Sequence, residues 1–309
     1  LLDGLSKVPD LVARAKEHGM DALALTDHGA MYGAIELYQT CEKHAMKPLI
    51  GCEIYMAVRS RHDKEHGIDN KRYHLTLLAK NNTGYRNLMK IVSKAYLEGY
   101  YYKPRADKEL LQEHAEGIIC LTGCPASEFI QNLKNKNIDA ARELLQWYID
   151  TFGKEHVFVE VMQHAEVEWY DQALLDDLIR LSQEFDLPIV GTWDSHYLHQ
   201  DDREAHDTLL AINTNNKNFK LNGNYSFISS EEAKEIFKDI PGAYENTHKV
   251  AQMCDVQLEL GKWVFPEFPI PDGETHDSLL KKKVYAGIEW RYGETSSEIE
   301  ERIEYELKV

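Results

Sequence analysis

The sequence predicts an α/β fold in which strands and crossover helices alternate, most specifically a (β/α) barrel. Two observations support this prediction. Apolar, β-rich segments alternate with amphipathic helical segments from the start of the chain to about residue 212, which is the pattern of parallel strands joined by helices. Ligand-type side chains occur at several different strands, as at the top face of a barrel, whereas a sheet with one crevice would gather them on two loops.

The expected elements follow from hydrophobic periodicity. Apolar segments predict strands at 22–26, 48–56, 73–79, 117–122, 156–162 and 188–192, with a weaker strand at 225–228. Helical spacing of apolar residues predicts helices at 10–18, 31–44, 84–97, 138–151 and 168–184. This alternating order implies that neighbouring strands run parallel.

The composition changes after residue 212. The segment 213–228 is polar and rich in Asn and Gly, which predicts a loop, and helices are expected at 230–237 and 243–254. Three prolines in 265–273 predict a linker, and charged helices at 279–291 and 297–309 follow it. We therefore expect a barrel domain over 1–264, a linker over 265–273 and a helical region over 274–309. The last helix has no C-terminal cap, as expected for a piece of a longer chain.

The bulk composition narrows the classes of function. A net charge of −17 disfavours a free-standing nucleic-acid-binding module, which normally has a basic face, but not a catalytic domain that contacts nucleic acid at one pocket. No run of 18 apolar residues occurs, so no membrane span is expected. Five cysteines without the sequence of a signal peptide indicate reduced thiols and a cytoplasmic location.

Candidate ligands occur at or near the ends of successive strands. Asp27 and His28 follow the first strand, although Asp27 could instead cap the next helix. Glu53 interrupts an apolar strand, where a carboxylate is costly unless it is paired, coordinates a cation or faces water. His74 opens the next strand, and a lone histidine there is more often a hydrogen-bonded core residue.

Three further candidates are less distinctive individually. Cys124 follows the strand at 117–122, and such a cysteine is by default a small buried hydrophobe. Glu160 alternates with valines, so exposure of one strand face would also explain it. His164 lies just past the end of the same strand, where a loop histidine is unremarkable.

The sharpest local signal is Asp194-Ser195-His196 after the strand at 188–192. In an extended chain, residues two apart lie on the same side, so Asp194 and His196 could share one cation. Because five strand regions each supply such a residue, the set predicts a metal centre. Nitrogen and oxygen ligands with one possible thiolate suit Zn, Mn or Fe, and we expect two or three divalent ions. Such centres hydrolyse phosphate esters, with Asp194, His196 and Glu53 as the catalytic candidates.

These motifs, in this order, resemble the PHP (polymerase and histidinol phosphatase) superfamily. The segments 1–57 and 73–111 are similar to the alpha subunit of bacterial DNA polymerase III, and other PHP hydrolases do not share the second segment. The resemblance covers essentially the whole chain. It implies a distorted seven-stranded (β/α) barrel with a trinuclear metal site, at the N-terminus of a DNA-directed DNA polymerase. The helices from 274 would begin the polymerase region, whose own catalytic carboxylates would lie beyond Val309.

The resemblance also implies individual ligands. Asp3 in the segment LLDG matches the first motif of the family. In the family a His-x-His pair lies upstream of this motif on the first strand, and because this sequence begins at Leu1, the first strand of the expected barrel is incomplete here. The following ligand positions match His28, Glu53, His74, Cys124, Asp194 and His196, while His164 and, less closely, Glu160 match additional polar residues of the site.

Three functions are compatible with these observations. The first is an active metal-dependent phosphoesterase domain within the replicase, for example a 3′–5′ exonuclease or a pyrophosphatase. The second is a catalytically silent, metal-stabilised scaffold for the polymerase core and a proofreading exonuclease subunit. The third is a stand-alone PHP phosphatase, which the segment 73–105 and the helices after 273 disfavour. The expected partners are DNA, through the full-length polymerase, and other replicase subunits.

Two basic residues in the segment YYKPR, Lys103 and Arg105, are candidate phosphate contacts. A solvated loop is the commoner explanation for such residues, so both interpretations stay open from the sequence.

Overall fold

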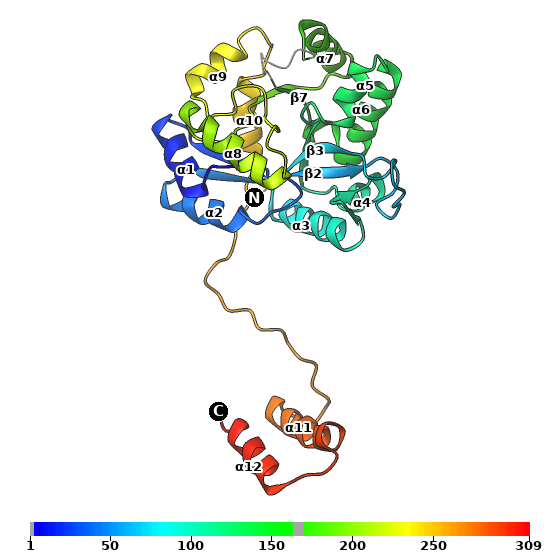
Figure 1. Ribbon diagram of the computed structural model, residues 1–309, viewed down its shortest axis with the longest axis vertical. Helices are drawn as coiled ribbons and strands as arrows, with labels where there is room; N and C mark the ends of the chain where they lie inside the picture. The colour runs from blue at the N-terminus through cyan, green and yellow to red at the C-terminus, as the bar shows by residue number, and fades with distance from the viewer. Residues whose placement is uncertain (1–2, 163–169) are drawn as a thin grey trace. The chain divides into compact units, whose positions relative to one another are not determined.

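The computed structural model describes residues 3–162 and 170–309. By internal contacts the chain divides into two compact units, Leu1–Leu258 and Glu259–Val309. The first unit contains the sheet and most of the helices, and the second contains two helices (Figure 1). In the described residues, no helix is both long and apolar enough to cross a membrane.

The sheet of the first unit is mixed. The strand β2, the longest, pairs antiparallel with β3 along one edge, and its other edge pairs in parallel with β1 near its start and with β5 near its end. The path continues from β3 through β6 and β7 to β8. The eight strands are β1 (Ala22–Leu25), β2 (Lys47–Ala57), β3 (Arg72–Ala79), β4 (Tyr100–Tyr101), β5 (Lys103–Ala106), β6 (Ile118–Leu121), β7 (Val157–Met162) and β8 (Ile189–Thr192).

The expectation that all neighbouring strands run parallel is wrong for β3. It is antiparallel to both β2 and β6. A parallel connection needs a crossover, usually a helix, but residues 58–71 between β2 and β3 contain no helix. The chain therefore returns directly beside β2.

The predicted α/β class is confirmed. In the described residues the sheet is open and does not close into a continuous barrel. Six strands lie close to their predicted positions, and the short hairpin β4–β5 was not predicted. The predicted strand at 225–228 is reduced to one isolated bridge between Ser226 and Tyr197. Within residues 3–162 and 170–309, the strands β1 and β8 have no pairing with each other.

Helices surround the sheet (Figure 1). Several begin with a side chain that caps the free backbone N–H groups of the first turn, for example Asn81 before α3 and Asp171 before α7. The α-helices of the first unit are α1 (Val8–Glu17), α2 (Ala34–Lys43), α3 (Asn82–Leu97), α4 (Lys108–Glu113), α5 (Glu128–Lys134), α6 (Ile138–Phe152), α7 (Gln172–Phe185), α8 (Arg203–Thr214), α9 (Ser230–Ile236) and α10 (Glu245–Met253).

The main hydrophobic core lies between the sheet and the helices that follow β3 and β6. Leu75 and Leu77 of β3 and Leu88 and Ile91 of α3 have no exposed surface. A second cluster packs α1 and α2 against the start of β2. These cores hold β2 and β3 rigidly, and those two strands carry two of the candidate ligands.

The second unit contains α11 (His276–Tyr292) and α12 (Ser297–Glu306). The two helices contact each other through the Tyr285 hydroxyl, which donates to a carboxylate oxygen of Glu304 at 2.6 Å. The predicted helices at 279–291 and 297–309 therefore correspond to observed helices.

Candidate metal centre

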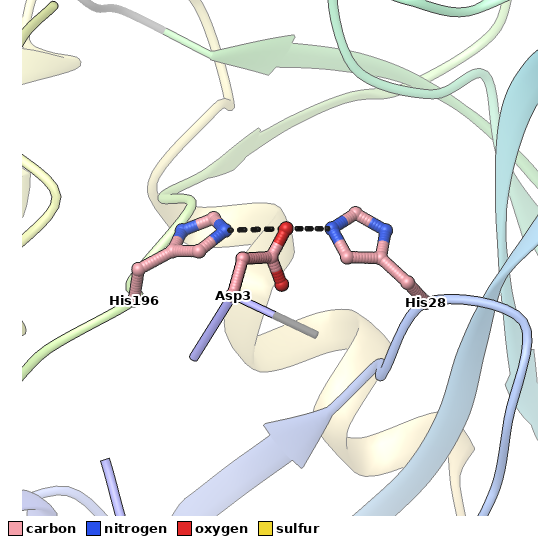
Figure 2. A group of neighbouring side chains, drawn as sticks. All are labelled: Asp3, His28 and His196. Atoms are coloured by element: carbon pink, nitrogen blue, oxygen red, sulfur yellow. Dashed lines mark ion pairs between the residues drawn. The ribbon is translucent and has the colours of Figure 1, made fainter. Parts of the chain in front are cut away.

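A first group of potential ligands consists of Asp3, His28 and His196, whose ligand atoms lie within 4.8 Å of one another. Figure 2 shows the Asp3 carboxylate between the two imidazoles. Its Oδ2 atom lies 3.2 Å from Nε2 of His28 and 3.8 Å from Nε2 of His196. The three residues come from the start of the chain, the end of β1 and the segment after β8.

A second group consists of His28, Glu53 and His74. The Glu53 Oε1 atom lies 2.6 Å from Nδ1 of His74 and 2.8 Å from Nδ1 of His28. Cys124 extends this group, since its Sγ atom lies 3.3 Å from the same Nδ1 atom of His74. Two nitrogens, one carboxylate oxygen and one sulfur therefore converge on one region.

The atoms at the centre of this second group are buried but are not satisfied as hydrogen-bonding groups. Nδ1 of His28 and Oε1 of Glu53 have no hydrogen-bond partner among the described residues, despite their short separation. Buried polar atoms are normally paired, and this pair approaches closely without the alignment of a hydrogen bond. Lone pairs directed at a shared point are what metal coordination requires, so the donor set fits a divalent cation.

The sheet fixes the positions of the second group. Glu53 accepts a backbone hydrogen bond from Gly29 and donates one to Asp27, at 2.8 and 3.1 Å, which holds the His28 loop against β2. His74 forms an isolated parallel bridge with Ser127, which brings the Cys124 turn to the start of β3. The ligand-type side chains therefore rest on backbone pairing rather than on free loops.

A histidine of helix α8 holds Asp3 in place. Nε2 of His206 lies 2.7 Å from the backbone carbonyl oxygen of Asp3, and His206 is almost fully buried. The backbone N–H of Leu5 donates to the carbonyl of His196 at 2.7 Å. The first described residues therefore lie beside the segment that follows β8 and beside α8 (Figure 1).

Asp194 lies behind His196 rather than among the closest ligand groups. The Nδ1 atom of His196 lies 3.1 Å from the Asp194 carbonyl oxygen and 3.4 Å from its Oδ1 atom. An imidazole held at Nδ1 in this way presents Nε2 to the site. The arrangement assigns Asp194 an orienting position and directs Nε2 of His196 towards Asp3.

The charged groups of the cluster shift one another strongly. Burial disfavours the charged imidazoles, but ion pairing outweighs it and raises the pKa of His28 to about 10 and that of His196 to about 9. Burial likewise opposes ionisation of the carboxyls, yet the histidines lower the pKa of Glu53 to about 2 and hold the pKa of Asp3 well below its usual range. Metal binding here would displace protons from the imidazoles.

Glu160 lies in the interior of the sheet, 2% exposed, which contradicts the possibility of an exposed strand face. Its carboxylate accepts hydrogen bonds from the Gly123 backbone at 2.9 Å and from the Thr192 hydroxyl at 2.7 Å. Burial raises its pKa to about 7; the Thr192 bond opposes this effect and the Glu53 charge adds to it. Glu160 is not a member of either ligand group.

Both interpretations of Arg105 from the sequence, a phosphate contact and a residue of a solvated loop, are wrong. It is 0% exposed, and its guanidinium donates to the backbone carbonyls of Gly99, Asp69, Arg61 and Asp63 at 2.8–3.0 Å. All of these acceptors are carbonyls of the loop 58–71 or of the turn before β4, so Arg105 has a structural role.

The remaining candidates are placed as follows. Asp27 does not cap a helix, because α2 begins only at Ala34 with Gly33 as its N-cap residue. Lys103 lies with its Nζ atom 5.8 Å from the centroid of the Tyr55 ring, beside the second ligand group. His164 lies outside the described residues.

A cavity of about 890 Å³ adjoins both groups. Asp3, His28, Glu53 and His196 line it on one side, and apolar side chains of β1 and β8 line it on another. The candidate centre therefore faces space for a substrate.

Several residues around the site carry no signal that sequence reasoning could use. His206 is one histidine on the apolar face of a helix, and Tyr55 and Arg72 look like ordinary strand residues. One hint to Arg72 and Tyr55 is available. Each lies two residues from a candidate ligand, Arg72 from His74 and Tyr55 from Glu53, and so shares one face of its strand with that ligand.

Comparison with known proteins finds relatives that match the chain over essentially its whole length. DNA polymerase III subunit alpha of Treponema pallidum is 42% identical over 318 residues, covering 100% of this chain and 27% of that protein. The corresponding protein of Borreliella burgdorferi is 37% identical and covers 100% and 28%. That of Thermus aquaticus is 37% identical and covers 96% and 26%. The chain thus spans roughly a quarter of the length of these relatives.

A solved structure from Bifidobacterium adolescentis, described only provisionally as a metal-dependent phosphoesterase, is 13% identical, with a TM-score of 0.37. It covers 76% of this chain and 92% of its own. The PHP domain model matches residues 1–164, more than half of the chain, and these residues contain the second ligand group, so the chain belongs to the PHP domain family.

Proposed function

We propose that this chain is the PHP region of a bacterial DNA polymerase III alpha subunit and acts as a metal-dependent phosphoesterase-type domain. The observation that supports the metal-dependent part is the close, unaligned approach of the buried Nδ1 atom of His28 and Oε1 atom of Glu53, neither of which has a hydrogen-bond partner in the described residues. The identity to the alpha subunits supports the assignment to a replicase, with DNA and other replicase subunits, such as a proofreading exonuclease, as partners in the cytoplasm.

The ligand sets divide between two ions. His28, Glu53, His74 and Cys124 would hold one, and Asp3 and His196 would hold the other. A neutral imidazole has a single lone-pair nitrogen, so His28 serves only one of the two. The mixed nitrogen, oxygen and sulfur donors suit Zn, Mn or Fe.

The chain's own residues would divide the remaining work. Bound divalent ions supply Lewis-acid chemistry to a phosphate ester. His196, oriented by Asp194 through Nδ1, presents Nε2 to the site as a ligand atom. Apolar side chains of β1 and β8 also line the cavity.

The test measures metal content by mass spectrometry and manganese-dependent hydrolysis of a phosphodiester and of 3′-ended DNA. We expect bound metal and hydrolysis in the native chain, and loss of both with Glu53→Gln. The His196→Ala and Asp194→Ala variants should lose hydrolysis. Glu113→Gln, an exposed carboxylate paired with Lys94, is the matched control and should change neither. Metal without hydrolysis in the native chain would instead support the scaffold role.

A further inference from the structure

Two cations lie beside the second ligand group without an acidic partner. The Arg72 guanidinium carbon is 5.3 Å from the centroid of the Tyr55 ring, and the Lys103 ammonium is 5.8 Å from the same centroid. In residues 3–162 and 170–309, neither forms an ion pair within 4.0 Å, and the Arg72 side chain donates a long hydrogen bond of 3.5 Å to the Asn70 carbonyl. The chain has 52 acidic residues and only 35 lysines and arginines, so two adjacent unpaired cations are unusual here.

The same tyrosine ring contacts the ligand group directly. The His28 ring is stacked with it at 6.1 Å, and the His74 ring meets it edge-on at 5.3 Å. Tyr55 is itself 4% exposed. The Tyr55 ring therefore lies beside both ligand imidazoles and both cations, and it stabilises the cations through cation–π contact.

The strand register explains why the cations lie there. His74 is paired with Tyr55 across β2 and β3, and residues two apart on one strand share a face. Arg72 therefore lies on the face of β3 that carries His74, one step beyond it, and Tyr55 likewise lies one step beyond Glu53 on β2. Lys103 approaches from β5, the other neighbour of β2.

We propose that Arg72 and Lys103 form a subsite that binds the phosphate group of a phosphate ester at the edge of the metal centre. The inference rests on the proposed function, because it names the group that the same site recognises. A guanidinium can bind two phosphate oxygens at once and an ammonium adds a point charge. Bringing two like charges together without a carboxylate is unfavourable until an anion binds between them.

Exposed tyrosines next to Lys103 favour a nucleic-acid strand as the source of that phosphate. Tyr100 and Tyr102 are 53% and 59% exposed, and the ring of Tyr100 stacks with that of Tyr96 at 6.3 Å. Tyr102 adopts a positive φ of 60°, a conformation that costs energy in a non-glycine residue and clusters at functional sites. Exposed aromatic rings beside cations are a common platform for the bases of a single strand.

The experiment titrates the metal-loaded chain with inorganic phosphate, and separately with a single-stranded oligothymidylate, by calorimetry. The variants are Arg72→Gln, Lys103→Gln and the double substitution, with Arg72→Lys as the charge-conserving variant. Arg86→Gln is the matched control, since Arg86 is an exposed arginine of α3 outside both ligand groups. Metal content is measured for every variant.

We expect the double variant to bind inorganic phosphate at least about tenfold more weakly, with unchanged metal content, while Arg72→Lys recovers part of the loss and Arg86→Gln binds normally. An equal or larger loss for the oligonucleotide identifies a strand as the ligand, and a loss confined to inorganic phosphate identifies a small ester. Phosphate affinity within twofold of the native chain, loss of metal in the double variant, or no phosphate binding by the native chain would overturn the proposal. If phosphate binding depends on the pair but no ester is hydrolysed, the subsite stands and the phosphoesterase function fails.

Discussion

Glu53 and His74 lie diagonally across the antiparallel strands β2 and β3, and their side chains meet with Oε1 2.6 Å from Nδ1. Their registered partners are Thr76 and Tyr55 respectively, so the contact joins residues displaced by one step on each strand's ligand-bearing face. Because both strands are packed into rigid hydrophobic clusters, the distance between the two ligand atoms is fixed by the sheet. The centre is therefore preorganised, and changes at its edges should have separable effects.

Cys124→Ser should change which metal the centre prefers. The thiol is buried, and burial raises its pKa well above the ordinary value, so it becomes a strong ligand only when a cation holds its thiolate. Replacing sulfur by oxygen should weaken zinc binding by tenfold or more and manganese binding much less. Competition titrations with a metal-binding dye measure both affinities. Cys254→Ser, a buried cysteine outside the ligand groups, is the control, and an equal loss of zinc in both variants would contradict the prediction.

His206→Ala should weaken metal binding although His206 is not in either ligand group. Its Nε2 atom contacts the Asp3 carbonyl oxygen at 2.7 Å, so removing the ring frees the segment that carries the Asp3 carboxylate. Residues that orient ligands typically change metal affinity by about 10–100-fold. Metal affinity and content are the measurements, with the exposed His248→Ala as control. Unchanged affinity in His206→Ala would show that Asp3 is held by other contacts.

Glu160→Gln should stabilise the metal-free chain in a pH-dependent way. Burial raises the pKa of Glu160 from 4.5 to about 7, so the folded state holds a proton that the unfolded state releases. The native chain therefore loses stability as the pH rises from about 4.5 through about 7, by about 3 kcal/mol. The amide does not titrate.

The measurement for Glu160 is urea unfolding of both chains in the presence of a chelator at pH 5 and pH 8. The free energy of unfolding of Glu160→Gln minus that of the native chain should be larger at pH 8 than at pH 5, by up to about 3 kcal/mol. Glu143→Gln, an exposed position on α6, should show no such difference. A variant whose relative stability is the same at both pH values would rule out titration of Glu160 as the cause.

Arg105→Met should destabilise the first unit by at least about 3 kcal/mol, because four carbonyl groups lose a buried cationic donor. Methionine keeps the length of the side chain and removes the donors. Chemical unfolding of Arg105→Met and of the exposed control Arg86→Met measures the difference. Proteolysis of the loop 58–71 should also accelerate in Arg105→Met, and an intact, protease-resistant loop would show that its other contacts suffice.

The sequence predicted the ligand-bearing strands because a charged residue in an apolar strand is conspicuous. Glu53 stands out between apolar neighbours, and the structure places it in a ligand group. The role of Asp194 as a ligand stays a prediction, since the spacing Asp-x-His does not distinguish a ligand from a residue that orients the histidine. The direction of β3 was missed although no helix was predicted between the strands at 48–56 and 73–79, so the absence of a crossover helix was visible in the sequence.

The structural roles of Arg105 and His206 escaped prediction for one physical reason. Both bind backbone carbonyl oxygens, and every residue of the chain carries such an acceptor, so no residue pattern marks the partner. Charged side-chain pairs leave a pattern of opposite charges, whereas a side chain bound to the backbone leaves none. The strands, most helices and the acidic and imidazole ligands were therefore within reach of the sequence, and the residues that hold them in place were not.

The attachment of Asp3 to His206 has a consequence for the order of folding. These residues are separated by 203 positions, so the Asp3 carboxylate reaches its place only after β8 and α8 exist to receive it. The residues of the group His28, Glu53 and His74 span only positions 28–74, and Cys124, which extends this group, also precedes β8 and α8. During synthesis the second ligand group should therefore be complete well ahead of the first. The centre forms in two stages, and the second stage requires that the rest of the first unit has already folded.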